Sequence, residues 1–478
     1  MIVLYLILAL LVVFLAVVLI RTAMFRPKEE EKKSFGEESF DRERAVSNLQ
    51  QLIRCKTVSN RDPALEDDAE FEKLIAMLPE LYPNVFQRCT MQRMEDRGLL
   101  FRWTGKNHGD PAVLMAHYDV VPVEEENWEK PAFEAILEDG VLWGRGALDT
   151  KVTLNGVLSA AEHLIAQGFV PENDVYFAFS GGEEINGLGA VHIVEYFEQN
   201  HITPAFVVDE GGAVVKDIFP GVSEACGLIG IAEKGMLDLE YRVMSDGGHA
   251  SAPPPHTPVG ELAMACAAVE AHPFKSHLTK PVAEMFDTLG RHSTFLYRMI
   301  FSNLWCFGGV LDGICKKSGG ELNALMRTTV AFTQMQGSKA SNVIPPSASL
   351  VSNIRLNPED TMDSAMAYLR DVVGNAHVEL TALRGMNPTH ISETGCPAWQ
   401  KVADAVAGTW KGCLVSPYLM VQCSDSRHYD KICNHVYRFS AMDLTTEERH
   451  TIHGNNERIR VETAQRAVEF YIRLMKQC

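Results

Sequence analysis

The chain has 478 residues, of which 46% are hydrophobic and 22% are charged, and its formal net charge is -18. A chain of this length exceeds what one simple core accommodates, so we expect at least two domains. The composition is that of an ordinary globular protein, while the acidic balance argues against a nucleic-acid-binding surface. No repeat with a period of about 20–50 residues is present, which argues against a solenoid or a propeller.

The first predicted element is an apolar helix at the N-terminus. Residues Ile2 to Ile20 include no charged side chain, and a helix of that length spans a bilayer. A cleaved signal peptide is the alternative, but no basic residue precedes the run and no small-residue cleavage site follows it. We therefore expect a single-pass transmembrane anchor. Arg21, Arg26 and the lysines that follow favour a cytoplasmic body, although these charges leave the side open.

The residues after the anchor are charged and poor in apolar side chains, which predicts a tether. Helical periodicity begins near Ala45. From there to about Glu233, short apolar runs suited to buried parallel strands alternate with helices. One of these helices, in "TLNGVLSAAEHLIAQGF", is expected to stop near Gly168. Such an alternation predicts an α/β domain with a mainly buried sheet.

The pattern changes near Lys234, where an alternating strand, an amphipathic helix and a second alternating strand follow one another. Buried-strand character then returns after about Arg384. We therefore expect one α/β domain interrupted by a smaller α+β domain, whose exposed strand and helix suit pairing with a second copy. The predicted organisation is 1–22 anchor, 23–44 tether, 45–233 first part of the α/β domain, 234–384 inserted domain, and 385–478 second part of the α/β domain.

Acidic and imidazole side chains stand where the predicted strands end. In open α/β sheets, ligands bind outside the carboxyl ends of the strands, so these side chains are expected at one edge. Crowded carboxylates repel, and burying an unpaired ion costs several kcal/mol, which calls for a cation among them. The side chains are His117, Asp119, Asp149, Glu183, Glu184, Asp209, Glu210, and two histidines in a polar loop, His450 and His453.

Imidazole together with carboxylate suits zinc, with manganese or cobalt as alternatives. Two histidines and several acids indicate two ions about 3.5–4 Å apart that share one carboxylate. Asp149 is the expected bridge because its side chain is short. One ion would take His117, Asp149 and an acid from "VVDEGG", and the other would take Asp149, Glu184 and His453.

Two acids remain for other roles. Asp119, two residues after His117, is placed to orient that imidazole by accepting its second ring N–H. Glu183 adjoins the predicted ligand Glu184 and is the expected general base, which removes a proton from a water between the ions and passes it to the leaving group. The nucleophile would then be a bridging hydroxide.

These motifs resemble the M20 family of metallopeptidases and aminoacylases, and most of all its carboxypeptidase S-like branch, which includes N-acyl-amino-acid hydrolases. The motifs "HYDVVP", "GVLWGRGALDTK", "SGGEE", "DEGG", "GGHASAPP", "SDSRHY" and "IHG" occur in the family's order from Leu114 to Gly454. The resemblance implies a di-zinc exopeptidase-like catalytic domain interrupted by a lid and dimerisation domain. It also implies functional roles by position, with His117, Asp149, Glu184 and His453 as metal ligands, Asp119 as the orienting acid and Glu183 as the general base.

The family leaves the remaining ligand in "DEGG" ambiguous. Adjacent strand residues point to opposite faces, so only one of the pair is expected to bind; Asp209 is favoured, with Glu210 as the alternative. In the lid, His249 of "GGHASAPP" resembles a residue that stabilises the oxyanion, often across a dimer interface, and Asn342 resembles one with a comparable role. Arg427 resembles the residue that holds a substrate carboxylate, a task that suits a guanidinium fork.

The leading functional hypothesis is metal-dependent hydrolysis of an amide bond next to a free carboxylate, with a small peptide or an N-acyl amino acid as substrate. The enzyme would be a carboxypeptidase, a dipeptidase or an N-acyl-amino-acid hydrolase. The alternatives are a deacylase of a biosynthetic N-acyl intermediate and a catalytically silent, membrane-anchored binding protein. The aromatic, apolar stretch from Arg291 to Phe307 is expected to be lid core or a dimer face, with a channel for a lipophilic acyl group as the alternative.

Overall fold

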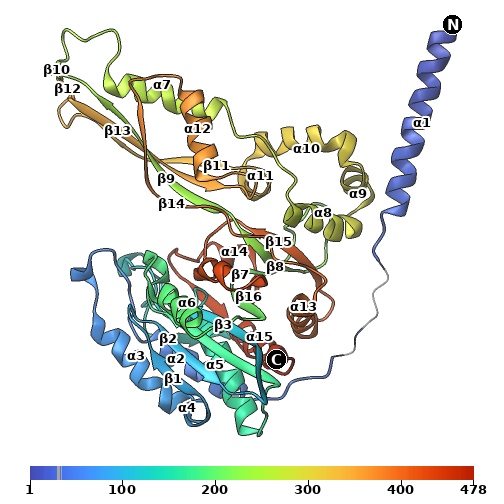
Figure 1. Ribbon diagram of the computed structural model, residues 1–478, viewed down its shortest axis with the longest axis vertical. Helices are drawn as coiled ribbons and strands as arrows, with labels where there is room; N and C mark the ends of the chain where they lie inside the picture. Colours follow the sequence, from blue (N-terminus) through green and yellow to red (C-terminus); the bar gives the residue numbers. More distant parts are fainter. Residues whose placement is uncertain (29–32, 34) are drawn as a thin grey trace.

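The computed structural model describes residues 1–28, 33 and 35–478 (Figure 1). At its centre lies an eight-stranded mixed sheet in the order β1-β2-β6-β3-β7-β16-β8-β15. The inner strands β6, β3, β7 and β16 run parallel to one another, while β1 and β2 are antiparallel. The strands are β1 (Thr90–Arg93), β2 (Leu99–Trp103), β3 (Asn107–His117), β6 (Asn173–Ser180), β7 (Phe206–Val215), β8 (Cys226–Glu233), β15 (Leu414–Met420) and β16 (Val436–Leu444). The predicted α/β class is confirmed, with a mixed sheet.

Helices cover both faces of this sheet. On one face, a large apolar cluster joins β3 and β6 to α2 (Arg42–Ile53), α5 (Lys151–Ala166), α13 (Pro397–Thr409) and α15 (Val461–Met475). On the other face, a smaller cluster is completed by α6 (Gly189–Gln199) and the 3-10 helix η4 (Asp425–Lys431). Helix α5 ends just before Gly168, whose φ of +75° suits the predicted stop.

A second sheet, in the order β11-β13-β9-β14, forms a separate antiparallel unit covered by two helices. Its strand β13 alternates strictly between partly exposed and buried positions, as expected for a sheet that packs on one face only. In Figure 1 the short pair β10–β12 lies at the far tip of this unit, away from the central sheet. The elements are β9 (Gly235–Met244), β10 (Gly248–His249), α7 (Pro258–Ala271), β11 (Thr329–Gln336), β12 (Val343–Ile344), β13 (Ser347–Leu356), α12 (Met362–Val373) and β14 (Glu379–Met386).

Four helices lie between α7 and β11 in the chain. They do not share the apolar cluster that α7 forms with the second sheet. Buried side chains of α8, including Met285 and Phe286, share an apolar cluster with β8 and β15 of the central sheet. This segment falls within the predicted inserted domain 234–384, whereas its packing joins it to the central sheet. The helices are α8 (Lys280–His292), α9 (Phe295–Ser302), α10 (Leu304–Ser318) and α11 (Gly320–Met326).

The N-terminal helix α1 (Ile2–Met24) stands away from the central sheet and touches the body at α9 (Figure 1). Among the described residues it is the one helix long and apolar enough to cross a membrane. The expected tether 23–44 begins inside this helix, which continues to Met24, and its residues 29–32 and 34 lie outside the described part of the chain.

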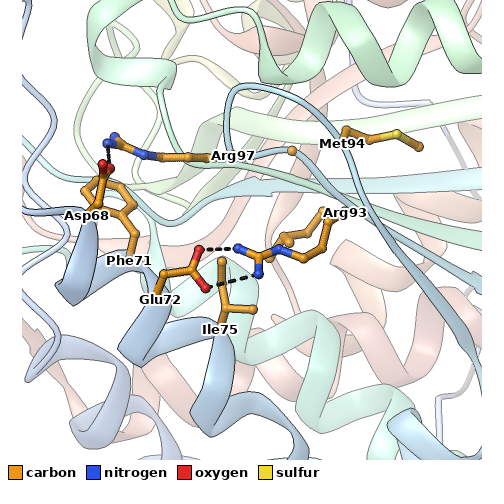
Figure 2. A pocket seen from close by; sticks show the side chains of 9 residues that line it. Asp68, Phe71, Glu72, Ile75, Arg93, Met94 and Arg97 are labelled. Atoms are coloured by element: carbon orange, nitrogen blue, oxygen red, sulfur yellow. Dashed lines mark hydrogen bonds and ion pairs between the residues drawn. The ribbon is translucent and has the colours of Figure 1, made fainter. Parts of the chain in front are cut away.

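A small pocket lies between α3 (Asp68–Leu81) and the β1–β2 turn (Figure 2). Two ion pairs close it, Arg93 with Glu72 and Arg97 with Asp68. None of the predicted site residues is among the described residues that line it. The pocket is therefore separate from the cluster described next.

Candidate metal centre

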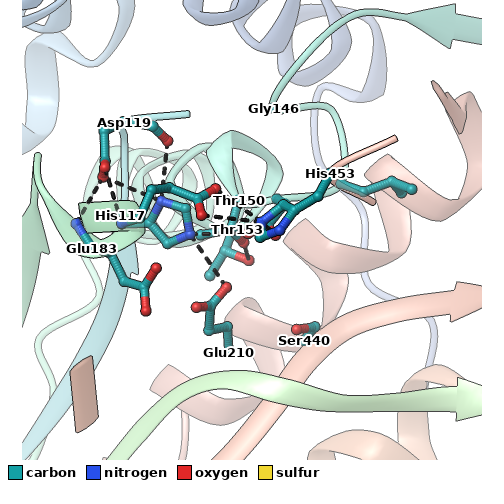
Figure 3. Close-up of polar contacts among 12 residues, drawn as sticks. His117, Asp119, Gly146, Thr150, Thr153, Glu183, Glu210, Ser440 and His453 are labelled. Carbon is teal, nitrogen blue, oxygen red and sulfur yellow. Dashed lines mark hydrogen bonds and ion pairs between the residues drawn. The ribbon is translucent and has the colours of Figure 1, made fainter. Parts of the chain in front are cut away.

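Two histidines converge on one aspartate at the edge of the central sheet (Figure 3). His117 is the last residue of β3, and its Nε2 lies 2.9 Å from Oδ1 of Asp149. His453 Nε2 lies 2.9 Å from the other oxygen of that carboxylate and 3.0 Å from Oε2 of Glu184. His117 is buried, whereas the side chain of His453 is 52% exposed, so the cluster opens to solvent on the His453 side.

A small three-stranded sheet brings the Asp149 and His453 loops together. Its strands are β4 (Ile136–Glu138), β5 (Val141–Trp143) and β17 (Arg458–Arg460), in the order β17-β5-β4. The Asp149 loop follows β5, and the His453 loop precedes β17. Since Arg458 at the start of β17 pairs with Trp143 at the end of β5, the His453 loop ends where the Asp149 loop begins. The other histidine of that loop, His450, donates its backbone N–H to the last turn of α14 (Thr446–Arg449).

Glu457 is a completely buried carboxylate directly behind Asp149. Its Oε1 accepts the backbone N–H groups of Leu148 at 2.7 Å and Asp149 at 3.1 Å. Its Oε2 pairs with Nη1 of Arg145 at 2.7 Å. Glu457 is not among the site residues predicted from the sequence, where its one signal is an acid four positions after His453 in "IHGNNE". Glu457 therefore positions the loop that presents the Asp149 side chain.

Asp119 contacts both the imidazole and the turn that carries the two adjacent glutamates. Nδ1 of His117, the ring nitrogen that faces away from Asp149, lies 3.1 Å from the backbone carbonyl oxygen of Asp119 and 3.4 Å from Oδ1 of its carboxylate. The same carboxylate accepts the backbone N–H groups of Glu183 and Glu184 at 3.1 Å each. It is completely buried and also accepts the hydroxyl of Ser59 at 2.7 Å. The residue expected to orient His117 thus lies against its second ring nitrogen.

Glu183 begins a short 3-10 helix, η3 (Glu183–Ile185), that follows β6. Ligand atoms of Glu183, His117 and Glu210 lie within 4.8 Å of one another, as do those of His117, Asp149 and Glu184. Since His117 belongs to both groups, the two clusters are adjacent. This is a donor set of imidazole nitrogen and carboxylate oxygen, which fits zinc, manganese or cobalt.

The acids of "DEGG" lie inside β7 and not at its end, contrary to the expectation from sequence. Asp209 pairs with Arg438 and Gly212 pairs with Phe439, which leaves Glu210 and Gly211 as an irregularity in the ladder. An irregularity of this kind bends a strand and redirects a side chain. Gly211 has a φ of +147°, a conformation that glycine adopts without steric cost.

The two candidate ligands have different neighbours at this irregularity. Oε2 of Glu210 lies 3.4 Å from Nε2 of His117. The carboxylate of Asp209 instead accepts the backbone N–H of Ser426 at 2.9 Å. This geometry favours Glu210, the alternative ligand, over Asp209, because Glu210 lies beside the predicted metal ligand His117 whereas Asp209 contacts η4.

The charges in the cluster are poorly balanced without a cation. Burial raises the pKa of Glu183, and the nearby Glu210 raises it further; burial and Asp149 raise the pKa of Glu210 to about 8. Hydrogen bonds to Asp149 and Glu184 raise the pKa of His453 to about 10. Burial lowers the pKa of His117, but Glu210 and the hydrogen-bonded acids raise it well above the usual range. Glu183 and Glu210 therefore resist ionisation, while burial is outweighed at Asp149, whose pKa the hydrogen bonds from His117 and His453 lower. The imidazoles retain protons, which a divalent cation would displace.

Three further predicted residues lie outside this cluster. His249 is exposed on β10 at the far tip of the inserted unit (Figure 1), where its Nδ1 contacts Ser251. Asn342 is next to it, since the Ala250 N–H donates to the Asn342 carbonyl at 3.0 Å. Arg427 lies on η4 and donates to the side chain of Asn186 at 3.1 Å. The structure thus brings His249 and Asn342 together, but at a distance from the two-histidine cluster.

Comparisons with known proteins show which proteins the chain resembles. The model of Peptidase family M20/M25/M40 matches residues 113–477. An N-fatty-acyl-amino acid synthase/hydrolase of Xenopus tropicalis is 34% identical over 98% of this chain and 93% of its own. A probable carboxypeptidase S-like protein of Dictyostelium discoideum is 30% identical over 98% of this chain and 92% of its own. The M20 family metallo-carboxypeptidase Sso-CP2 of Sulfolobus solfataricus has the same fold, with a TM-score of 0.68 at 17% identity over 90% of this chain and 98% of its own.

Proposed function

The chain is a hydrolase that belongs to peptidase family M20/M25/M40, and on that basis we propose that it cleaves an amide bond adjacent to a free carboxylate. The substrate is an N-acyl amino acid or a small peptide. Relatives named as an N-fatty-acyl-amino acid synthase/hydrolase and as a carboxypeptidase S-like protein, each aligned over 98% of the chain, support this substrate class. The observation that carries the proposal is the convergence of His117 and His453 on the two oxygens of Asp149.

The donor set fits two divalent ions, zinc being favoured over manganese or cobalt. His117, Asp149 and Glu210 would hold one, and Asp149, Glu184 and His453 the other. When bound, such ions supply Lewis-acid activation of water and polarisation of the scissile carbonyl. The raised pKa values of Glu183 and Glu210 support a need for positive charge at this position.

In this proposal, Glu183 is the general base. Its carboxylate is not one of the six donor positions, yet it lies beside His117 and Glu210. It accepts a proton from the attacking water and donates it to the nitrogen of the leaving group. Asp119 positions both His117 and Glu183, since it contacts Nδ1 of the imidazole and accepts the backbone N–H of the glutamate.

We assign recognition of the substrate carboxylate to Arg427. Its Nε and Nη1 have no hydrogen-bond partner among the described residues, so two donors of the fork remain for an anion. His249 and Asn342 act on the site of a second copy in a homodimer. Support for this arrangement comes from their exposed location at the far tip of the inserted unit (Figure 1).

We also propose that α1 remains attached as a single-pass membrane anchor. Val18 and Thr22 of this helix are buried against the body. The side-chain amide of Asn303 donates to the Val18 carbonyl at 3.3 Å and to Oγ1 of Thr22 at 3.2 Å. These contacts support a helix that stays with the folded protein over a cleaved signal sequence.

The experiment is a substrate panel assayed with the full chain in lipid nanodiscs. Dipeptides and N-acyl amino acids, with acyl groups from acetyl to long-chain, are tested after chelation and after addition of zinc, manganese or cobalt. Hydrolysis is expected for substrates with a free α-carboxylate, only when metal is present, and not for their methyl esters. Equal cleavage of the methyl esters, or no cleavage of any substrate with metal, would contradict the proposal.

A further inference from the structure

The helices α9 and α10 pack directly against the apolar N-terminal helix. Besides the contacts of Asn303 with α1, Nε of Arg21 donates to the Ser302 carbonyl at 3.2 Å. The hydroxyls of Thr22 and Ser302 lie 3.2 Å apart. The contacts of Thr22 and Asn303 are buried and that of Arg21 is partly buried, and together they join the start of α10 to the last turns of α1.

An aromatic contact lies deeper along the same helix. The ring of Trp305 meets the ring of Phe14 edge to face, with centroids 5.7 Å apart. Phe14 precedes Arg21 by two helical turns, which is about 10 Å along the axis. A bilayer has a hydrocarbon core about 30 Å thick. If α1 crosses it with Arg21 at the boundary, Trp305 lies at the depth of the acyl chains.

The neighbouring surface of α9 and α10 is apolar and uncovered. From Phe295 to Ile314, Arg298 and Asp312 are the charged residues, and Asp312 pairs with Arg327. Exposed apolar side chains gathered on neighbouring helices are typical of an interaction site, and aromatic residues concentrate at membrane boundaries. The large exposed apolar side chains are Phe295 (55%), Leu296 (61%), Tyr297 (40%), Trp305 (58%), Val310 (58%) and Ile314 (52%).

We propose that this surface of α9 and α10 is immersed in the same lipid leaflet as the adjoining part of α1. The protein is then bound to the bilayer through its folded body as well as through its anchor. The occupant is lipid because whatever covers Trp305 also borders α1, whose apolar side chains are themselves exposed. The inference rests on the membrane anchoring proposed above and is independent of the substrate.

The test is quenching of tryptophan fluorescence by lipid. The full chain is reconstituted in phosphatidylcholine vesicles whose acyl chains carry bromine, and Trp305→Phe is compared with the unaltered protein. Quenching is expected in the unaltered protein and is expected to disappear in Trp305→Phe. Trp143→Phe, which removes a partly exposed indole on β5, serves as the matched control and should keep the quenching.

A second pair of variants separates this surface from α1 itself. Phe295→Glu combined with Leu296→Glu should reduce the quenching of Trp305, whereas Leu383→Glu, at an equally exposed apolar position on β14, should not. Quenching that persists unchanged in Trp305→Phe would overturn the proposal, as would a mature protein that lacks residues 1–24. Since fluorescence does not depend on turnover, these outcomes are distinguishable from failure of the proposed hydrolysis.

Discussion

Glu457 receives the backbone N–H of Asp149 at 3.1 Å, although Asp149 is itself the carboxylate on which both histidines converge. Glu457 thus positions Asp149 through a hydrogen bond to its backbone. In Glu457→Gln the charge opposite Arg145 is lost, which leaves a buried guanidinium without its ionic partner. We expect the free energy of unfolding to fall by about 3–5 kcal/mol, and metal affinity to fall by about 10–100-fold.

Denaturant titration and metal-binding calorimetry measure the two effects of Glu457→Gln. The control is Glu447→Gln, since Glu447 pairs with Arg458 at an exposed position. Its effect on stability should stay within about 0.5 kcal/mol. Equal stability of the two variants would contradict the positioning role.

Glu183→Gln tests the general base. The amide cannot accept a proton, so kcat should fall by at least about 10²–10⁴-fold. Metal content, measured by elemental analysis, and thermal stability should be retained, because Glu183 is not a proposed ligand. Normal turnover in this variant would remove Glu183 from the mechanism.

If Glu210 and not Asp209 is the ligand, variants of these two residues should bind different numbers of metal ions. Glu210→Ala should retain fewer metal equivalents than the unaltered chain, because one ion loses a ligand. Asp209→Asn should keep both, because an amide oxygen can still accept the Ser426 N–H. Elemental analysis after gel filtration distinguishes the two variants. Loss of metal in Asp209→Asn alone would restore the prediction made from the sequence.

Metal removal should destabilise the fold. Ligands that bind the native state alone stabilise it by about 2.7 kcal/mol at a concentration of one hundred times Kd. Dialysis against a chelator should therefore lower the melting temperature, and zinc should restore it. His453→Ala should respond less to zinc. A melting temperature unaffected by chelation in both proteins would argue against a metal centre.

His428 predicts sensitivity to acid. Burial, with Arg427 and Lys431 adding repulsion, lowers the pKa of His428 to about 4. In the unfolded chain His428 takes up a proton near pH 6.5, whereas in the folded chain it stays neutral until about pH 4. The free energy of unfolding is therefore highest above pH 6.5 and decreases as the pH falls towards 4. The slope is at most about 1.4 kcal/mol per pH unit. His428→Gln should flatten the decline in denaturant titrations, whereas His256→Gln, at an exposed position, should leave it unchanged.

The sequence predicted the structure best where a strand pattern leads directly into a residue whose side chain can bind metal. The apolar run that leads to His117 forms β3, and Asp119 lies beside the imidazole as expected. The sequence did not point to the geometry that favours Glu210 over Asp209, because the rule of alternating strand faces cannot reveal the irregularity at Gly211. That irregularity depends on the pairing of β7 with β16, which lies more than two hundred residues further along the chain.

Two other features were also out of reach of sequence patterns. Glu457 acts on backbone N–H groups, and these carry no sequence signature. The stretch from Arg291 to Phe307 was expected to be lid core, a dimer face or a channel. Its apolar character was correctly recognised, but a helix that is apolar on one face does not indicate which partner it meets. Its packing against α1 is a tertiary contact between distant segments.

The hydrogen bonds from Asn303 to the backbone and side chain of α1 have a mechanical consequence. A protein attached to a membrane only through a flexible linker would rotate freely, and its site would face every direction. Here the last turns of α1 pack against the globular part of the chain. If α1 spans a membrane as proposed, these contacts would restrict the direction in which the opening beside His453 faces relative to the membrane plane.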